Sequence, residues 1–430
     1  YRKWAEDIHS QLVGKPMSMQ RFGGVDRWMN AYRALTRSSL LGELGLVAAG
    51  ELKNAIALTS MRAMTKQMPS LGAFFKSLRE GHIPNKELQK DINSIWGFGH
   101  ERAMAYARQH ELTDFSYDVQ LTKFENWANS ASHVTDVVSG NGHFTSFTRE
   151  ATASMKIQEL SDVANGFKTL TASERERLVA NGISEHNIDA VMADLKAHTE
   201  LDGETIIKID HEQWALDNPE TFNDFRLAVD RSVREAIQDH DIGEIPAWIH
   251  SPTGKIFSEL RTFTLGAHTK QFLKGLHYRD ATTMAQWSYG FVGESLAYSM
   301  QTSMNYAHDP EKLKKLLTPE AIAKAAINRM GVLGVLPMAL ETPTQILTGH
   351  TLLGNSTANT GSRNFLVPPS LAQAQKQYGA LGTIGTAISP FSDKQLTSSQ
   401  VKNGFQGLPL SNTYGVRNLV DMLSSQYPAN

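Results

Sequence analysis

The sequence predicts a mainly α-helical protein: an elongated multi-helix bundle with a small polar helical insertion and an extended, loop-rich C-terminal tail. Apolar residues recur at steps of three and four along most of the first 340 positions, which is the period of an α-helix. Clusters of Gly, Pro and Asn interrupt that pattern and mark turns. Only residues 204–210 are rich in β-branched side chains, so we expect one short strand or extended link there.

The composition is that of a folded chain with little overall charge. Its 430 residues are enough for two or three domains, at about 150 residues each. The formal net charge of −2 gives no global field that would attract nucleic acid or a membrane, so any such contact has to be local. The chain has no cysteine, which excludes disulfides, thiolate metal ligands and cysteine nucleophiles within it.

Changes in texture along the chain suggest four segments. We expect a helical domain at 1–165, a small helical insertion or linker at 166–215, a second helical domain at 216–340 and an extended tail with short helices at 341–430. The chain opens at Tyr1 in an amphipathic pattern with no signal peptide before it, and we interpret it as part of a longer polypeptide.

Local signals place several helix ends. Glycine-containing turns are expected at 81–85, 97–99 and 140–142. Helix starts are expected at Asp26, at Thr171 and at Asn218, because each is a capping residue ahead of an apolar or helical pattern. Pro219 fits the first turn of the last of these helices, where its missing N–H costs nothing.

A basic amphipathic helix is predicted after the turn at 251–254. Its apolar face, Ile256 to Ala267, repeats at helical spacing, and Gly275 is where we expect it to end in a left-handed cap. Its cationic residues are Lys255, Arg261, Lys270, Lys274 and Arg279. Two interpretations stay open. This face is solvated or contacts another subunit, or it lines a passage and contacts DNA phosphates without reading sequence, in a salt-dependent way.

Three weakly apolar segments come closest to membrane helices, at 40–58, 284–300 and 321–340. Each carries at least one charged residue, and a central charge costs about 2.5–3.5 kcal/mol on insertion, so none would insert alone. They are either buried core helices or helices that pack in an oligomer whose polar face is wet. The candidates for membrane or oligomer contact are Trp287, Tyr289, Phe291, Val332, Leu333, Val335 and Leu336.

Catalytic patterns are sparse, and we predict that this chain is not an enzyme and holds no metal or cofactor. It contains no phosphate-binding loop and no Gly-x-Ser-x-Gly motif, and its histidines lack the i, i+4 pairing of a zinc-binding helix. Glu294-Ser295 is the one suggestive pair, because lytic transglycosylases use a catalytic Glu followed by Ser. The residues after it, Leu296-Ala297-Tyr298, do not match that family.

Four short runs form a pattern in the second half of the chain. They read Gly254-Lys255-Ile256-Phe257, Lys270-Gln271-Phe272-Leu273-Lys274, Tyr289-Gly290-Phe291-Val292-Gly293 and Asn328-Arg329-Met330-Gly331-Val332-Leu333-Gly334. With them, residues 245–340 resemble the C-terminal part of the large internal virion proteins, also called core or ejection proteins, of short-tailed podophages. The rest of the chain agrees with that family in its helical texture.

The resemblance implies a structural protein of the virion interior that forms a homo-oligomeric ring stacked on the portal complex. At infection such proteins are ejected and, with other internal virion proteins, form a conduit for double-stranded DNA across the host periplasm and inner membrane. Some members carry a lytic transglycosylase domain, which would lie on a missing N-terminal part of the parent protein. The alternative function is a soluble helical scaffold or adaptor with no DNA or membrane role.

Overall fold

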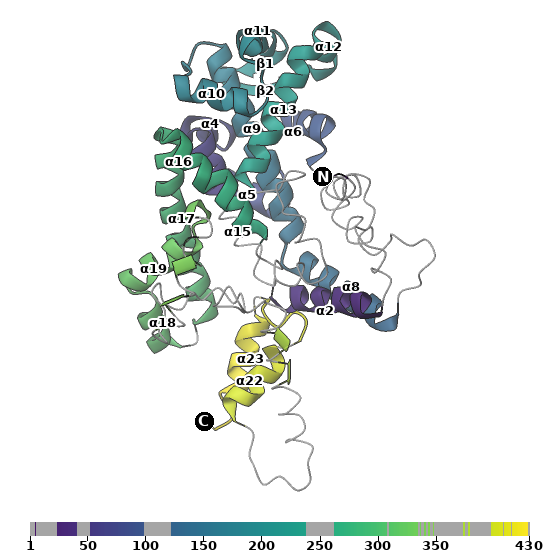
Figure 1. The fold of residues 1–430 in the computed structure, drawn as a ribbon, viewed down its shortest axis with the longest axis vertical. Coiled ribbons are helices and arrows are strands. Elements are labelled where there is room, and N and C mark those ends of the chain that lie inside the picture. Colours follow the sequence, from purple (N-terminus) through teal and green to yellow (C-terminus); the bar gives the residue numbers. More distant parts are fainter. Residues whose placement is uncertain are drawn as a thin grey trace.

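The computed structural model is mainly α-helical, as the sequence predicts (Figure 1). A helical core lies at one end of the molecule, α17–α19 extend from it on one side, and the pairs α2–α8 and α22–α23 lie toward the other end. The described residues are 24–40, 52–98, 122–237, 262–307, 309–333, 397–406, 408–413 and 415–428, with single or paired positions between them.

The elements follow in chain order. The first group is α2 (Gly24–Leu40), a helix described at 52–58, α4 (Met61–Gln67), α5 (Leu71–Glu80), α6 (Lys86–Trp96), α8 (Lys123–Val138) and α9 (Asn141–Ala164). The second is α10 (Ala172–Ala180), the 3-10 helix η3 (Glu185–Asn187), α11 (Ile188–Ala197), β1 (Thr199–Asp202), β2 (Thr205–Ile209), α12 (His211–Asp217) and α13 (Pro219–Ala236). The third is α15 (Thr262–Ala267), the π-helix η5 (His268–Leu273), α16 (Lys274–Tyr278), α17 (Ala281–Asn305), α18 (Pro310–Leu316), α19 (Pro319–Arg329), η6 (Gly331–Leu333), α22 (Ser398–Gln406) and α23 (Val416–Ser424).

Most local predictions of helix ends are confirmed. The three glycine turns contain Gly81, Gly97 and Gly140 with φ of 79°, 71° and 70°, a region that favours glycine. Thr171 forms a capping box in which its hydroxyl accepts from the Glu174 amide at 3.2 Å. The prediction for Asp26 is wrong, because α2 already begins at Gly24.

The β-rich run is a strand. β2 pairs with β1 in an antiparallel hairpin, with Thr199 opposite Ile209 and Asp202 opposite Thr205. Ile206 and Ile209 of β2 are buried, which joins the hairpin to the core. Among the described residues this hairpin is the whole of the β-structure.

A single cluster of buried apolar side chains runs from Leu52 to Ala236. It includes Leu178 of α10, Leu195 of α11 and Trp214 of α12. Residues 166–215, expected as an insertion or linker, therefore share one hydrophobic core with α9 and α13 and are not packed separately from them. Beyond this sharing, the expected domain boundaries remain predictions.

Helix α9 is the central element of this core and is buried on more than one side, so it carries buried polar residues as well as apolar ones. The fully buried Glu150 accepts hydrogen bonds from Asn93 Nδ2 at 2.9 Å and from the Ile83 amide at 3.3 Å. The buried carboxylate of Asp162 lies 2.9 Å from Lys66 Nζ. Buried charges need such partners, and α9 is therefore fixed to its neighbours by polar contacts.

The described part of the C-terminal tail contacts distant elements. The Leu410 amide donates to Ser38 O at 3.0 Å, and Asn412 Nδ2 donates to Ser39 O at 2.6 Å, at the end of α2. The short helices expected in the tail are present in its described part as α22 and α23.

None of the described helices is both long and apolar enough to cross a membrane.

Candidate functional site: the arm and its junction with the core

Five of the site residues expected from the sequence, Lys274, Arg279, Trp287, Tyr289 and Phe291, lie within residues 274–329. This segment contains helices α16 to α19, and we call it the arm. The helix that leads into the arm runs without interruption from α15 through η5 to Tyr278. The prediction that it ends near Gly275 is wrong. The left-handed residue is Arg279, with φ of 48°, and its amide donates to Gly275 O at 2.9 Å. Gly275 instead allows close packing, because a Cβ there would lie 3.0 Å from Thr283 Cγ2 of α17.

The predicted DNA-lining cations have different surroundings. Lys255 and Arg261 lie outside the described residues. Lys270 is buried, with 8% of its surface exposed, and Lys274 Nζ donates to Glu235 Oε2 of α13 at 2.6 Å. Only Arg279, of the three that are described, is exposed. Within the described residues Lys270 is therefore buried in protein, and the charge of Lys274 is compensated by Glu235.

An extended hydrogen-bond cluster surrounds Asp280, the N-cap residue of α17. Arg177 of α10 donates two hydrogen bonds to its carboxylate, from Nε to Oδ2 at 2.8 Å and from Nη2 to Oδ1 at 2.9 Å. Ser173 Oγ donates to Oδ2 at 2.5 Å, and the Thr283 amide donates to Oδ1 at 2.9 Å. Two-pronged charge-assisted contacts of this kind are among the strongest hydrogen bonds in proteins. The start of α17 is therefore fixed to α10.

Further charges extend this cluster across the junction. Arg177 Nη1 lies 4.0 Å from Glu235 Oε1, and Glu235 in turn binds Lys274. The four side chains are between 6% and 22% exposed and alternate in sign. We call Lys274, Glu235, Arg177 and Asp280 the charge chain. The guanidinium of Arg177 also lies 4.1 Å from the ring centroid of Tyr278, which adds a cation–π contact from the arm.

The protonation of two arm residues follows from this arrangement. Burial acts to raise the pKa of Asp280, but hydrogen bonds from Arg177, Ser173 and Thr283 outweigh it and hold that pKa well below its ordinary value. Burial also raises the pKa of Tyr278. At neutral pH Asp280 is therefore a carboxylate and Tyr278 a neutral phenol, the forms that suit Arg177.

A second polar contact joins the arm to the core near the middle of α17. Lys53, on the helix at 52–58, forms an ion pair with Glu294, and both side chains are largely buried. Gly293 makes room for it, because a Cβ at that position would lie 2.8 Å from Lys53 Cδ. Glu294 is the residue whose pairing with Ser295 suggested the catalytic Glu of lytic transglycosylases. In the structure its carboxylate is paired with a lysine of the core.

Helix α17 carries a row of exposed residues at intervals of four along its length. The row contains Met284, Ser288, Val292, Leu296, Met300 and Met304. Its apolar members are 44–63% exposed. Twenty residues of α-helix span about 30 Å at 1.5 Å each, and each step of four residues turns about 40° beyond a full turn. The row is therefore a long uncharged strip that winds around α17. This row was not predicted, although the i, i+4 spacing of Val, Leu and Met was a signal that could have revealed it.

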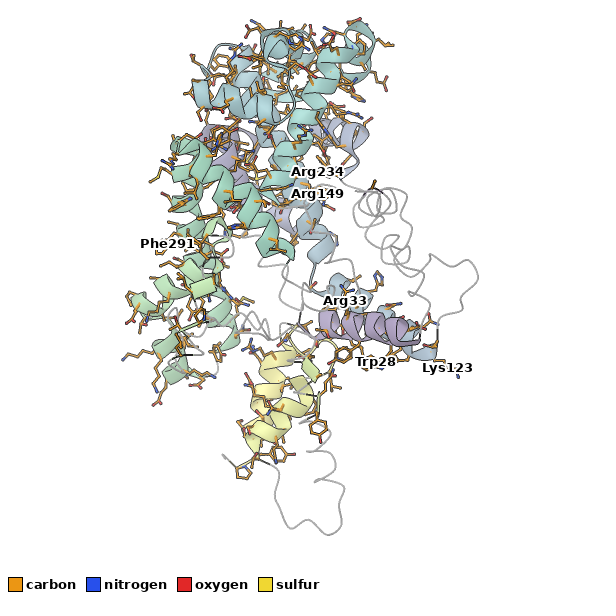
Figure 2. All side chains as sticks on the ribbon, in the orientation of Figure 1. Trp28, Arg33, Lys123, Arg149, Arg234 and Phe291 are labelled. Carbon is orange, nitrogen blue, oxygen red and sulfur yellow. The ribbon has the colours of Figure 1, made fainter. Side chains whose placement is uncertain are left out.

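The predicted membrane or oligomer contacts divide between the inside and the outside of the arm. Phe291 is 38% exposed and lies at the edge of the arm (Figure 2). Trp287 is half-buried, and its Nε1 lies close to Gly275 within the hairpin of α16 and α17. Of the others, Tyr289 and Leu333 are half-buried, Leu336 is exposed, Val335 lies outside the described residues, and the side chain of Val332 is not described.

The described residues contain no group of His, Asp and Glu side chains that could hold a metal ion. Comparison of the chain with protein-family models, with curated proteins and with solved structures finds no match in any of the three.

Proposed function

We propose that this chain is part of a structural internal virion protein that is ejected at infection and forms part of an oligomeric conduit for phage DNA across the periplasm and inner membrane. The resemblance of residues 245–340 to podophage ejection proteins supports this proposal. The observation that carries it within the structure is the exposed apolar row of α17, because a structural conduit needs helix faces that pack on neighbouring subunits.

The exposed apolar row is better suited to contact with another protein or with lipid than to contact with water. Single exposed apolar residues are normal on soluble proteins, whereas contiguous apolar faces mark contacts with proteins or membranes. Three of its members are methionines, whose flexible side chains adapt to more than one partner surface. We propose that the row packs on other copies, on other internal virion proteins or the portal complex, and on inner-membrane lipid after ejection.

Contact with DNA in this proposal is weak and without sequence preference. Of the described candidates Arg279 is the exposed cation, and its Nε donates to the Leu276 carbonyl at 2.9 Å. Each phosphate contact adds about one unit to the slope of binding against salt. Arg279→Gln should therefore weaken DNA retention by the chain and lower that slope by about one.

The proposal is tested by putting charge into the row. Leu296→Glu should abolish self-association of the purified chain and its flotation with anionic phospholipid vesicles, because a carboxylate would be buried in either contact. Leu216→Glu is the matched control, since Leu216 is 78% exposed on α12 in the core. A wild-type chain that stays monomeric and does not float, whatever stands at position 296, would favour the soluble scaffold.

A further inference from the structure

We propose that the arm is a detachable unit, which the charge chain holds against the core and which swings away when that chain is broken. Three independent features of the junction support this: the composition of the interface, the unpaired polar atoms within the arm, and the kind of helix that precedes it.

The interface lacks a continuous hydrophobic layer. Among the described residues, the buried apolar cluster of the core, from Leu52 to Ala236, includes none of the arm's side chains. The arm has buried apolar residues of its own, such as Tyr298 and Ala326, which lie where α17 packs against α18 and α19. Tyr298 Oη donates to Leu316 O at 3.0 Å, and Arg329 Nη2 donates to Gln301 Oε1 at 2.6 Å. The arm is thus held together by contacts that do not involve the core.

What joins the arm to the core is largely polar. The charge chain acts at the start of α17, and the pair of Lys53 and Glu294 acts fourteen residues further along the helix. Between units of one chain, interfaces of this polar kind favour relative motion. A buried ion pair also responds sharply to the loss of one partner, because the remaining charge is left without compensation. These contacts therefore hold the arm while both partners of each ion pair are charged, and they favour its release when one partner is lost.

Several buried polar atoms of the arm and of the preceding helix have no hydrogen-bond partner among the described residues. They are Nδ1 of His268, both side-chain amide atoms of Gln271, Nε2 of Gln286 and Nε1 of Trp287. Such orphaned groups are costly in a folded state. The orphaned atoms of His268 and Gln271 lie on η5 itself, so a bend there that admits water would relieve part of this cost.

The helix that leads into the arm offers a place to bend. η5 is a six-residue π-helix between two α-helical segments. π-turns are uncommon, and helices bend where they occur. Bending at η5 would carry α16 and α17 away from α10 and α13 without breaking the core. Release would also free Lys274 from Glu235, which would expose a cation that the docked arm conceals.

The test uses the full chain with Arg177→Met, which keeps an unbranched apolar stem and removes the charge. The natural chain has no cysteine, so spin labels at Glu185→Cys on η3 and Ser303→Cys on α17 report the distance between core and arm. Both positions are exposed. Arg177→Met should add a second, longer distance, and hydrogen exchange of α17 amides should quicken by at least about tenfold, since breaking a buried pair shifts an equilibrium by more than a decade. Amides of α9 and α13 should keep their protection.

The matched control is Arg175→Met, two residues away on the same helix, which removes an exposed pair with Asp189. It should leave the distance and the exchange unchanged. If Arg177→Met disturbs folding, Asp280→Asn replaces it, because Asn is an equally good N-cap residue and only the charge is lost. A single unchanged distance in both charge-chain variants would overturn the proposal, and so would loss of protection in α9 and α13 to the same extent as in α17.

Discussion

The ion pair between Lys53 and Glu294 allows a quantitative test of how the arm is held. Both side chains are largely buried, at 11% and 13% exposure, and they lie on elements far apart in the sequence. Lys53→Met keeps the apolar stem and leaves Glu294 as an uncompensated charge. Removal of one partner from a buried pair costs about 3–5 kcal/mol. We expect the opening free energy of α17 to fall by this amount, or the arm to be released outright if docking is weaker.

The double variant Lys53→Met with Glu294→Leu removes both charges and should recover most of that loss, because an apolar pair of similar volume is often as stable as a buried ion pair. Native-state hydrogen exchange of α17 amides measures the opening free energy in each variant. The control pair is Lys324 with Glu320, exposed neighbours on α19, whose removal should have a much smaller effect. If the double variant is no more stable than Lys53→Met, the pair does not hold the arm as described.

Other predictions concern pH, the shared core and one backbone position. The pKa of Asp280 is lowered in the folded chain, so its contribution to docking is present above its unfolded pKa of about 3.9 and is lost as pH falls further. Below about pH 4, arm docking should therefore weaken more steeply in the wild type than in Asp280→Asn, as the spin-label distance would show. Trp214 is fully buried against Phe225, so Trp214→Ala should lower the free energy of unfolding in urea by about 3–5 kcal/mol. It should destabilise α9 and α12 together. Loss of α12 alone would mean that residues 166–215 fold separately. Gly182 has φ of 108°, and a Cβ there would lie 2.6 Å from Leu227 Cδ2. Gly182→Ala should therefore lower the free energy of unfolding by about 1–3 kcal/mol in the same assay. An unchanged urea midpoint would show that the position tolerates a side chain and contradict this prediction.

The sequence was informative where the cause of a feature is local. Turn glycines such as Gly140, the capping box at Thr171 and the strand at 205–209 each depend on residues within a few positions. The helical class followed from the same short-range periodicity. Helix α9 is harder to interpret, because it is surrounded by other elements and its buried Glu150 and Asp162 remove the amphipathic contrast.

The junction of the arm could not be predicted, since its partners are far apart in the chain. Arg177 and Asp280 are separated by 103 residues, and Lys274 and Glu235 by 39. Lys274 looks like one member of an exposed basic face in the sequence, and only its contact with Glu235 shows that its charge is compensated. Gly275 was interpreted as a cap for a similar reason, because the close approach of Thr283 is a property of the hairpin and not of the helix alone.

The most direct test of the proposed function follows the chain through infection. The amount of this chain is measured by immunoblot in phage particles before and after triggered DNA ejection, with a capsid protein as the loading standard. The proposed function predicts a signal in full particles that is lost from emptied ones. A signal retained in emptied particles would contradict ejection, and no signal in full particles would contradict a place in the virion altogether.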